Sequence, residues 1–188
     1  MSKEDTSNTS DQLLAKQNYT LDDINRIEEF RSALLDFEKQ LIDVEGTYGA
    51  ASEAGTKAGL NEAANKVNPL IHTFGDGFYT RNISMPKGQL ITTGIHKKEH
   101  PFFVMKGDVS VLTEDGVHRI KAPYNGITQP GTKRLIYIHE DTVWITVHIT
   151  DAKTVEEVHD DVMAEDFNDP AVSLEKVKEM LQIKSDKS

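Results

Sequence analysis

The chain of 188 residues contains no cysteine, and this absence removes several classes of protein at once. A disulfide-stabilised fold, a thiolate metal site and a cysteine nucleophile all require the missing side chain. No stretch approaches the roughly 20 consecutive apolar residues of a membrane-spanning helix. The start of the chain, MSKEDTSNTSDQ, is polar where a signal peptide needs an apolar core. We therefore expect a soluble protein of the cytoplasm that does not bind a membrane.

Basic side chains are also scarce, because 21 Lys and Arg stand against 31 Asp and Glu, for a formal net charge of −10. The charge is uneven: residues 1–66 and 151–188 each carry a net −6, whereas residues 67–150 carry +2. The central region also contains six of the seven histidines and the single tryptophan. Phosphates repel a net-acidic chain that has no stripe of lysine or arginine, so we expect no nucleic-acid partner.

Three segments precede the central region. Residues 1–19 are polar and predict a mobile arm, because such a composition cannot offset the entropy of ordering a chain. Residues 20–46 predict an amphipathic helix with Thr20 as its N-cap and Gly46 at its end, and residues 47–67 form an Ala- and Gly-rich linker. Six apolar residues of the helix recur at alternating spacings of three and four, namely Ile27, Phe30, Leu34, Phe37, Leu41 and Val44. This seam would pack either on its own domain or on another subunit or partner.

Residues 68–150 show strand-like patterning instead. Short runs rich in Val, Ile, Thr, Phe and Tyr are separated by turn residues, among them Gly107, Asp115-Gly116 and His139-Glu140-Asp141. About eight short strands separated by such turns indicate an antiparallel β-sandwich or a small barrel. Residues 151–188 return to an acidic composition with helical periodicity, so we expect a helical C-terminal extension.

Glycines and histidines of the central region fall at a known spacing. Gly88 is followed by five residues, then Gly94-Ile95-His96, three residues, His100, six residues and Gly107. This resembles the first motif of the cupin superfamily, which reads Gly, five residues, His-x-His, three or four residues, Glu, six residues and Gly. Gly94 stands where that motif has its first histidine, His96 keeps the second, and His100 replaces the glutamate. The resemblance implies a jelly-roll β-barrel in which these positions line the interior.

A partial match to the second cupin motif follows. After Pro130-Gly131 and two further residues, Arg134 stands at the position of the family's last metal-binding histidine. The two matches together cover residues 77–150. Within that stretch, the runs IHKKEHPFFVMKGDVSVLTEDG and PGTKRLIYIHEDTVWITVHIT also resemble small cupin-like proteins encoded by tailed bacteriophages. That resemblance implies a phage gene product that acts in the host cytoplasm or is incorporated in the virion.

One interpretation of the interior histidines is a metal site. On an extended strand His96, Lys98 and His100 point to the same face, so both imidazoles would line the barrel. Two histidines need further donors, and the candidates are His148, His118, His139 and Glu99. We take His148 as the third ligand, with Fe, Ni, Mn or Zn as the divalent metal. A cation beside Lys98 and Arg134 is repelled, however, so the preferred expectation is no cofactor.

Two other interpretations of the interior remain. In one, Lys98, Arg134 and Tyr137 bind an anionic ligand such as a sugar that carries a carboxylate or phosphate. In the other, the polar lining is satisfied internally. In both, the lining side chains would stack on Tyr137 or Phe103. Phe102 and Trp144 are more typical of a core than of a ligand platform. No arrangement typical of a catalytic triad or of paired catalytic carboxylates is apparent, so no catalytic residue is assigned.

These patterns predict a mainly β protein: a small antiparallel cupin barrel over residues 68–150, with an N-terminal α-helix and C-terminal helices. The preferred function is non-enzymatic, that of a virion-associated structural or accessory protein that assembles as a homo-oligomer and with other virion proteins. Its interface is the helix seam, together with the barrel edges. One alternative is a metal-dependent cupin enzyme of the dioxygenase or sugar isomerase class that uses His96 and His100. The other is a cupin that binds an anionic sugar or another small molecule.

Overall fold

The computed structural model describes residues 21–41 and 62–180, which are mainly antiparallel β-structure. Helices α1 (Leu21–Leu41) and α2 (Glu62–Val67) precede the strands. The strands of the barrel region are β1 (Leu70–Phe74), β2 (Phe78–Met85), β3 (Leu90–Thr92), β4 (Ile95–His96), β5 (His100–Thr113), β6 (Gly116–Lys121), β7 (Tyr124–Thr128) and β8 (Leu135–Ile149). The C-terminal region contains α3 (Val155–Val162), β9 (Met163–Ala164) and α4 (Leu174–Met180). The predictions for Thr20, Val44, Gly46 and the terminal arm fall outside the described residues.

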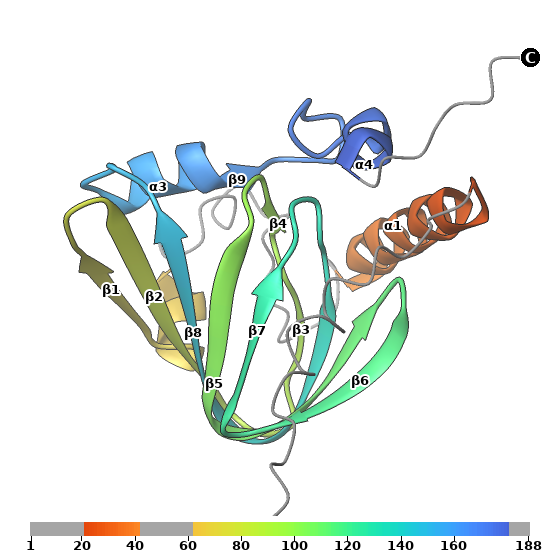
Figure 1. The fold of residues 1–188 in the computed structure, drawn as a ribbon. Helices are drawn as coiled ribbons and strands as arrows, with labels where there is room; N and C mark the ends of the chain where they lie inside the picture. The colour runs from red at the N-terminus through yellow and green to blue at the C-terminus, as the bar shows by residue number, and fades with distance from the viewer. Residues whose placement is uncertain (1–20, 42–61, 181–188) are drawn as a thin grey trace, which may run out of the picture.

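Seven of the strands form one antiparallel sheet that curls into a barrel. Their order is β1-β2-β8-β5-β6, with β3 paired to β8 and β7 paired to β5, while β4 and β9 form a separate pair. Figure 1 shows the strands converging at one end of the barrel, whereas α3, β9 and α4 lie across the other end. The predicted antiparallel jelly-roll barrel, with an N-terminal helix and C-terminal helices, is confirmed.

The two longest strands correct the prediction of many short ones. β5 continues through Gly107, and β8 continues through His139-Glu140-Asp141, where the sequence predicted turns. The pairing between these strands shifts register between Val104 and Val109. Gly107 has a φ of +106°, and a Cβ at this position would lie 2.7 Å from the Cα of Thr142. Such irregularities bend a strand without ending it, so these turn-forming residues mark a bend in a continuous ribbon.

A cluster of nine buried apolar side chains forms the barrel core: Met85, Phe102, Val104, Val109, Val111, Ile120, Ile136, Ile138 and Trp144. The rings of Phe102 and Trp144 stack with their centroids 4.6 Å apart. The prediction that both are core residues is therefore confirmed. Burial of these rings and aliphatic chains supplies the apolar area that stabilises a barrel of this size.

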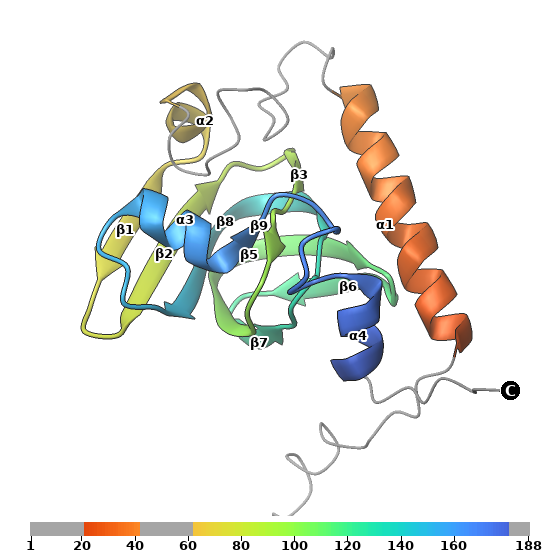
Figure 2. The same ribbon diagram turned by 90° about the horizontal axis from the view of Figure 1, so that it is seen from above.

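Helix α1 packs against its own chain and lies beside the barrel and α4 (Figure 2). The buried Arg31 of α1 donates hydrogen bonds to the carbonyl oxygens of Val172 at 2.9 Å and Gly131 at 3.3 Å. Its guanidinium carbon lies 4.2 Å from the centroid of the Phe167 ring. A buried guanidinium needs such partners, so Arg31 fixes α1 to the C-terminal region.

The predicted helix seam is only partly covered by these contacts. Leu34 is 4% exposed, whereas Ile27, Phe30, Phe37 and Leu41 are half-buried. The structure thus describes α1 as packed on its own domain, which was one of the two alternatives. A contact between subunits through the seam stays a prediction.

The segment that follows β8 covers one end of the barrel. Helix α3 begins after the N-cap Thr154, whose hydroxyl accepts a hydrogen bond from the Glu157 N–H at 3.2 Å. Val158 and Val162 of α3 are buried in a cluster with Tyr79 of β2. Within residues 21–41 and 62–180, no helix is long and apolar enough to cross a membrane.

Candidate metal centre

Three buried histidines from three different strands meet inside the barrel. His96 ends β4, His100 begins β5, and His148 is the penultimate residue of β8. One ring nitrogen of each histidine lies within 4.8 Å of the others. The ring centroids of His100 lie 4.2 Å from those of both His96 and His148. The structure thus brings together the three residues that the sequence analysis combined as a ligand set.

Burial keeps these three imidazoles neutral. Their exposed fractions are 6% for His96, 2% for His100 and 3% for His148. Desolvation lowers the pKa of His100 to about 4 and that of His148 to about 3. Desolvation likewise holds the pKa of His96 well below its ordinary value. At neutral pH each ring therefore offers a free lone pair, which is the form that binds a metal.

The hydrogen bonds of the rings also suit a metal ion. His100 Nδ1 lies 3.2 Å from the carbonyl oxygen of Lys98, so it acts as the donor and leaves the other ring nitrogen free. The Nδ1 atoms of His96 and His148 are buried without a hydrogen-bond partner among the described residues. Buried polar atoms rarely stay unpaired in proteins. Three neutral nitrogen donors, two of them with an unpaired buried atom, fit a divalent transition metal such as Fe, Ni, Mn or Zn.

Gly94, which stands at the position of the family's first histidine, cannot be replaced by that histidine without rearrangement. A Cβ at Gly94 would collide with the terminal methyl group of Met163. Met163 belongs to β9, which pairs with β4 through Ile95 and His96. The C-terminal extension thus fills the space that a side chain at position 94 would need. Position 94 therefore contributes no ligand, and the candidate centre consists of His96, His100 and His148.

The structure corrects the predicted position of Lys98. We expected Lys98 to share an interior face with His96 and His100, but its side chain is 48% exposed and its Nζ lies 2.6 Å from Asp161 Oδ1. The reason is that β4 ends at His96 and β5 begins at His100, so no continuous strand runs through residues 97–99. Alternation along a strand therefore does not apply to Lys98.

Arg134 and Tyr137 occupy different environments. The Nη2 atom of Arg134 donates a hydrogen bond to Thr128 Oγ1 at 3.0 Å, and its guanidinium lies over the Phe102 ring at 5.2 Å from the centroid. The predicted stacking on Tyr137 or Phe103 is wrong. Tyr137 is 43% exposed, and its ring contacts that of His139 edge-on. A shared ligand site for Lys98, Arg134 and Tyr137 is thus not assembled in this structure.

The weaker ligand candidates lie away from the three histidines. His118 is exposed on β6, and Glu99 is exposed and accepts a hydrogen bond from Gln129 at 3.0 Å. His139 was expected in an exposed turn, but it lies within β8 and its Nε2 is 2.8 Å from Ser110 Oγ. None of these three side chains belongs to the histidine cluster.

Arg81 is an interior residue that the sequence analysis missed. It lies in β2 on the same face as the buried residues Tyr79 and Met85, because alternate residues of a strand point to the same side. Its positive charge helps to lower the pKa values of His96, His100 and His148. The sequence alone carried no signal for this, because both faces of the run GFYTRNIS contain apolar residues and only the pairing of β2 with β8 shows which face points inward.

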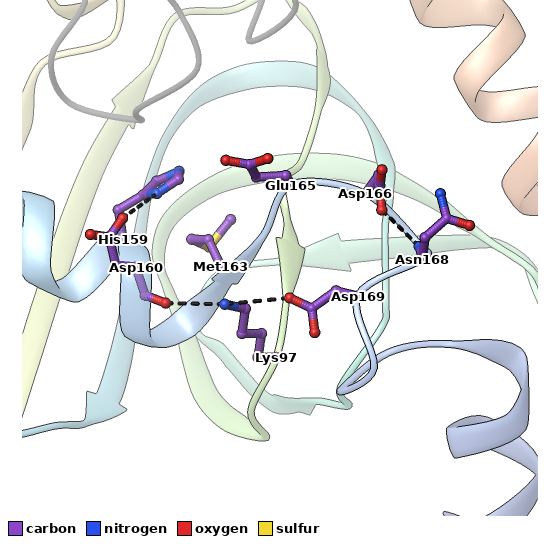
Figure 3. Close-up of a pocket in the computed structure, with 8 residues that line it drawn as sticks. All are labelled: Lys97, His159, Asp160, Met163, Glu165, Asp166, Asn168 and Asp169. Atoms are coloured by element: carbon purple, nitrogen blue, oxygen red, sulfur yellow. Dashed lines mark hydrogen bonds and ion pairs between the residues drawn. The ribbon is translucent and has the colours of Figure 1, made fainter.

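A second polar region lies outside the barrel, at the junction of β4, α3 and β9 (Figure 3). This open pocket is lined by Lys97, His159, Asp160, Met163, Glu165, Asp166, Asn168 and Asp169. Lys97 Nζ lies 3.4 Å from Asp169 Oδ2 and donates a hydrogen bond to the Asp160 carbonyl oxygen at 3.1 Å. The acidic side chains here are accompanied by a lysine, and the three buried histidines do not line the pocket.

The structure combines an antiparallel jelly-roll barrel with histidines from β4, β5 and β8, which lie at the end that the C-terminal extension covers. No family model and no curated protein matches the chain.

Solved structures provide distant likenesses. A cupin-2 domain protein from Shewanella frigidimarina is 11% identical with a TM-score of 0.37, over 44% of this chain and 79% of that chain. Ectoine synthase from P. lautus is 17% identical with a TM-score of 0.42, over 50% of this chain and 72% of that chain. DMSP lyase DddQ from Ruegeria pomeroyi is 16% identical with a TM-score of 0.40, over 46% of this chain and 49% of that chain.

Proposed function

We propose that this protein is a metal-binding cupin that holds one divalent transition metal through His96, His100 and His148. The observation that carries the proposal is the convergence of three buried, neutral imidazoles whose ring nitrogens lie within 4.8 Å of one another. A bound metal would supply a Lewis acid next to the covered end of the barrel. This favours the metal-dependent alternative of the sequence analysis over a purely structural barrel, and a dioxygenase or isomerase activity would be a special case of it.

The electrostatic objection to a cation at this place is reduced for the two charges that the sequence analysis named, while Arg81 adds a third charge that lowers the pKa values of the same histidines. Lys98, one of the two charges expected beside the metal, lies outside the barrel in an ion pair with Asp161. Arg134, the other, donates a hydrogen bond to Thr128 and lies over the Phe102 face, which partly satisfies its guanidinium. The three histidines are already neutral, so metal binding does not require them to lose protons at pH 7.

Metal analysis of protein purified without a polyhistidine tag tests the proposal. After chelation and reloading with Fe, Ni, Mn or Zn in turn, we expect one ion per chain for the preferred metal. His148→Ala and His100→Ala should abolish stoichiometric loading, while the matched control His118→Ala, an exposed histidine on β6, should load like the wild type. Equal loading of His148→Ala and wild type, or no loading by any metal, would contradict the proposal.

A second proposal is that the barrel assembles with further copies of itself through the outer face of the sheet. Large apolar side chains are exposed there, including Phe103 at 37%, Met105 at 58% and Ile127 at 53%. The neighbouring strands add Ile71 at 62% and Ile149 at 75%. The register connects them, because Phe103 pairs with Ile145, which pairs with Asn82, which pairs with Ile71. Exposed apolar side chains on one face of a sheet, here interrupted by Asn82, are typical of an interaction surface.

Light scattering distinguishes this sheet surface from the α1 seam. If the sheet carries the contact, Met105→Glu should reduce the mass of the particle, whereas Phe30→Glu on α1 should leave it unchanged. The opposite outcome would assign assembly to the seam, and a monomeric wild type would remove the proposal. Incorporation into a phage particle rests on the sequence resemblance alone, and its test is mass spectrometry of purified particles.

A further inference from the structure

The interior of the barrel contains buried polar atoms that no neighbour satisfies. Arg81 Nε and Thr146 Oγ1 are both buried and have no hydrogen-bond partner among the described residues. They face each other, because Arg81 of β2 pairs directly with Thr146 of β8. The next inward-facing pair along the same two strands is Tyr79 and His148. Side chains directly opposite on one face have Cβ atoms roughly 5 Å apart, so the two unpaired groups lie together, beside the candidate metal centre.

The charge of Arg81 also lacks a counterion. The acidic group that raises its pKa is the Tyr79 phenol rather than a carboxylate, while desolvation lowers the pKa. Glu114 and Asp161 are near enough to raise the pKa values of Arg134 and His148, but neither forms an ion pair with an interior arginine in the described part of the chain. Arg81 is half-buried as a whole, but its Nε atom is buried, and an unpaired buried donor is costly. The barrel interior therefore presents a charged donor that has no acceptor among the described residues.

The available hydrogen-bond donors limit which anionic group could bind beside Arg81. The backbone amides of β2 and β8 are engaged in the sheet ladder, so donors to a ligand must come from side chains. Arg134 donates one of its five N–H groups to Thr128, and the Arg81 guanidinium and the Thr146 hydroxyl are the donors on the paired strands β2 and β8. A planar guanidinium matches the two oxygens of a carboxylate, whereas a phosphate group presents a third oxygen that also needs donors.

We propose that Arg81 and Thr146 form a binding site for the carboxylate group of a small organic anion, next to the three histidines. The inference deepens the proposed function. It rests on that function only for the metal beside the site, because Arg81 and Thr146 can donate to a carboxylate whether or not a metal is bound. A divalent metal beside Arg81 and Arg134 would also make this region strongly cationic, and an anionic ligand balances that charge. The site therefore selects anionic over neutral molecules of the same shape.

Titrations of the untagged protein, followed by the ¹H–¹⁵N signals of the arginine Nε–H groups, test this site. The probes are acetate, its neutral isostere acetamide, and inorganic phosphate, each added to metal-free and metal-loaded protein. We expect acetate to shift the Arg81 Nε–H signal in both forms and acetamide to leave it unshifted. Arg81→Gln should weaken acetate binding at least about 10-fold, in line with the loss of a charge-assisted hydrogen bond. Thr146→Val, which keeps the side-chain shape, should weaken it by a smaller factor.

The matched control is Arg119→Gln, because Arg119 is an exposed arginine already ion-paired with Asp108. It should bind acetate like the wild type. If folded Arg81→Gln and Thr146→Val proteins bind acetate as tightly as the wild type, the proposal is overturned. It is also overturned if the wild type binds acetamide as tightly as acetate, or binds phosphate more tightly than acetate. Failure of metal loading with acetate binding intact would overturn the metal function alone, so the two proposals fail separately.

Discussion

The barrel interior and the pocket outside it contain similar residue types in opposite arrangements. Outside, each lysine has an acidic neighbour: Lys97 lies beside Asp169, and Lys98 beside Asp161. Inside, Arg81 has no carboxylate partner in the described part of the chain, and three histidines are kept neutral by burial. The exterior pairs are satisfied by the protein itself. The interior keeps unpaired polar atoms among the described residues, which is why both proposals place their ligand there.

The largest expected effect concerns metal affinity in the two regions. We expect His100→Ala to weaken metal binding at least about 100-fold, since even the loss of residues behind the ligands costs 10–100-fold. The double variant Asp166→Asn, Asp169→Asn in the outer pocket should leave the affinity within a factor of two or so of wild type. Isothermal titration of the untagged proteins measures both. A stronger effect of the outer variant would reverse the assignment of the two regions.

The next effect concerns the stability of the metal-free protein. Arg81→Met removes a half-buried arginine whose buried Nε atom has no partner among the described residues. We expect it to raise the free energy of unfolding by about 1–3 kcal/mol in buffer without carboxylates. Arg119→Met, which removes an exposed arginine paired with Asp108, should not stabilise the protein. Urea unfolding followed by circular dichroism gives both values. Destabilisation by Arg81→Met would mean that the guanidinium has partners after all.

A third effect concerns pH. His100 and His148 have pKa values of about 4 and about 3 in the folded protein, below the ordinary value of 6.5. The unfolded chain therefore binds more protons between pH 6.5 and 4, and stability falls as the pH is lowered through that window. Each histidine contributes at most about 1.4 kcal/mol per pH unit. His100→Gln should flatten the stability profile of the metal-free protein between pH 6.5 and 4, and an unchanged slope would contradict the buried neutral state.

The smallest effect is expected at the exterior ion pairs. Asp161→Asn breaks the contact with Lys98, whose side chain is 48% exposed. An exposed ion pair contributes roughly 0–1 kcal/mol, and salt screens it. Thermal unfolding at low and high salt should show a small loss that vanishes at high salt. A loss as large as that of a core substitution would show that this pair holds the C-terminal extension in place.

The sequence was informative where local spacing determines geometry. The interval between His96 and His100 selected these two histidines through its resemblance to the cupin motif, and His148 was one of four candidates for the missing donor. The sequence was misleading where the orientation of a side chain depends on segments that are distant in the chain. Lys98 turns outward because β4 ends early and pairs with β9, a two-residue strand within a segment of helical composition. Arg81 could be assigned to the interior only once the pairing of β2 with β8 fixed which face points inward.

Anomalous diffraction from a crystal of the metal-loaded, untagged protein tests the central claim most directly. The account predicts one strong anomalous peak per chain, about 2.0–2.3 Å from a ring nitrogen of each of His96, His100 and His148. A peak in the outer pocket between Lys97 and Asp169, with none among the three histidines, would contradict the account.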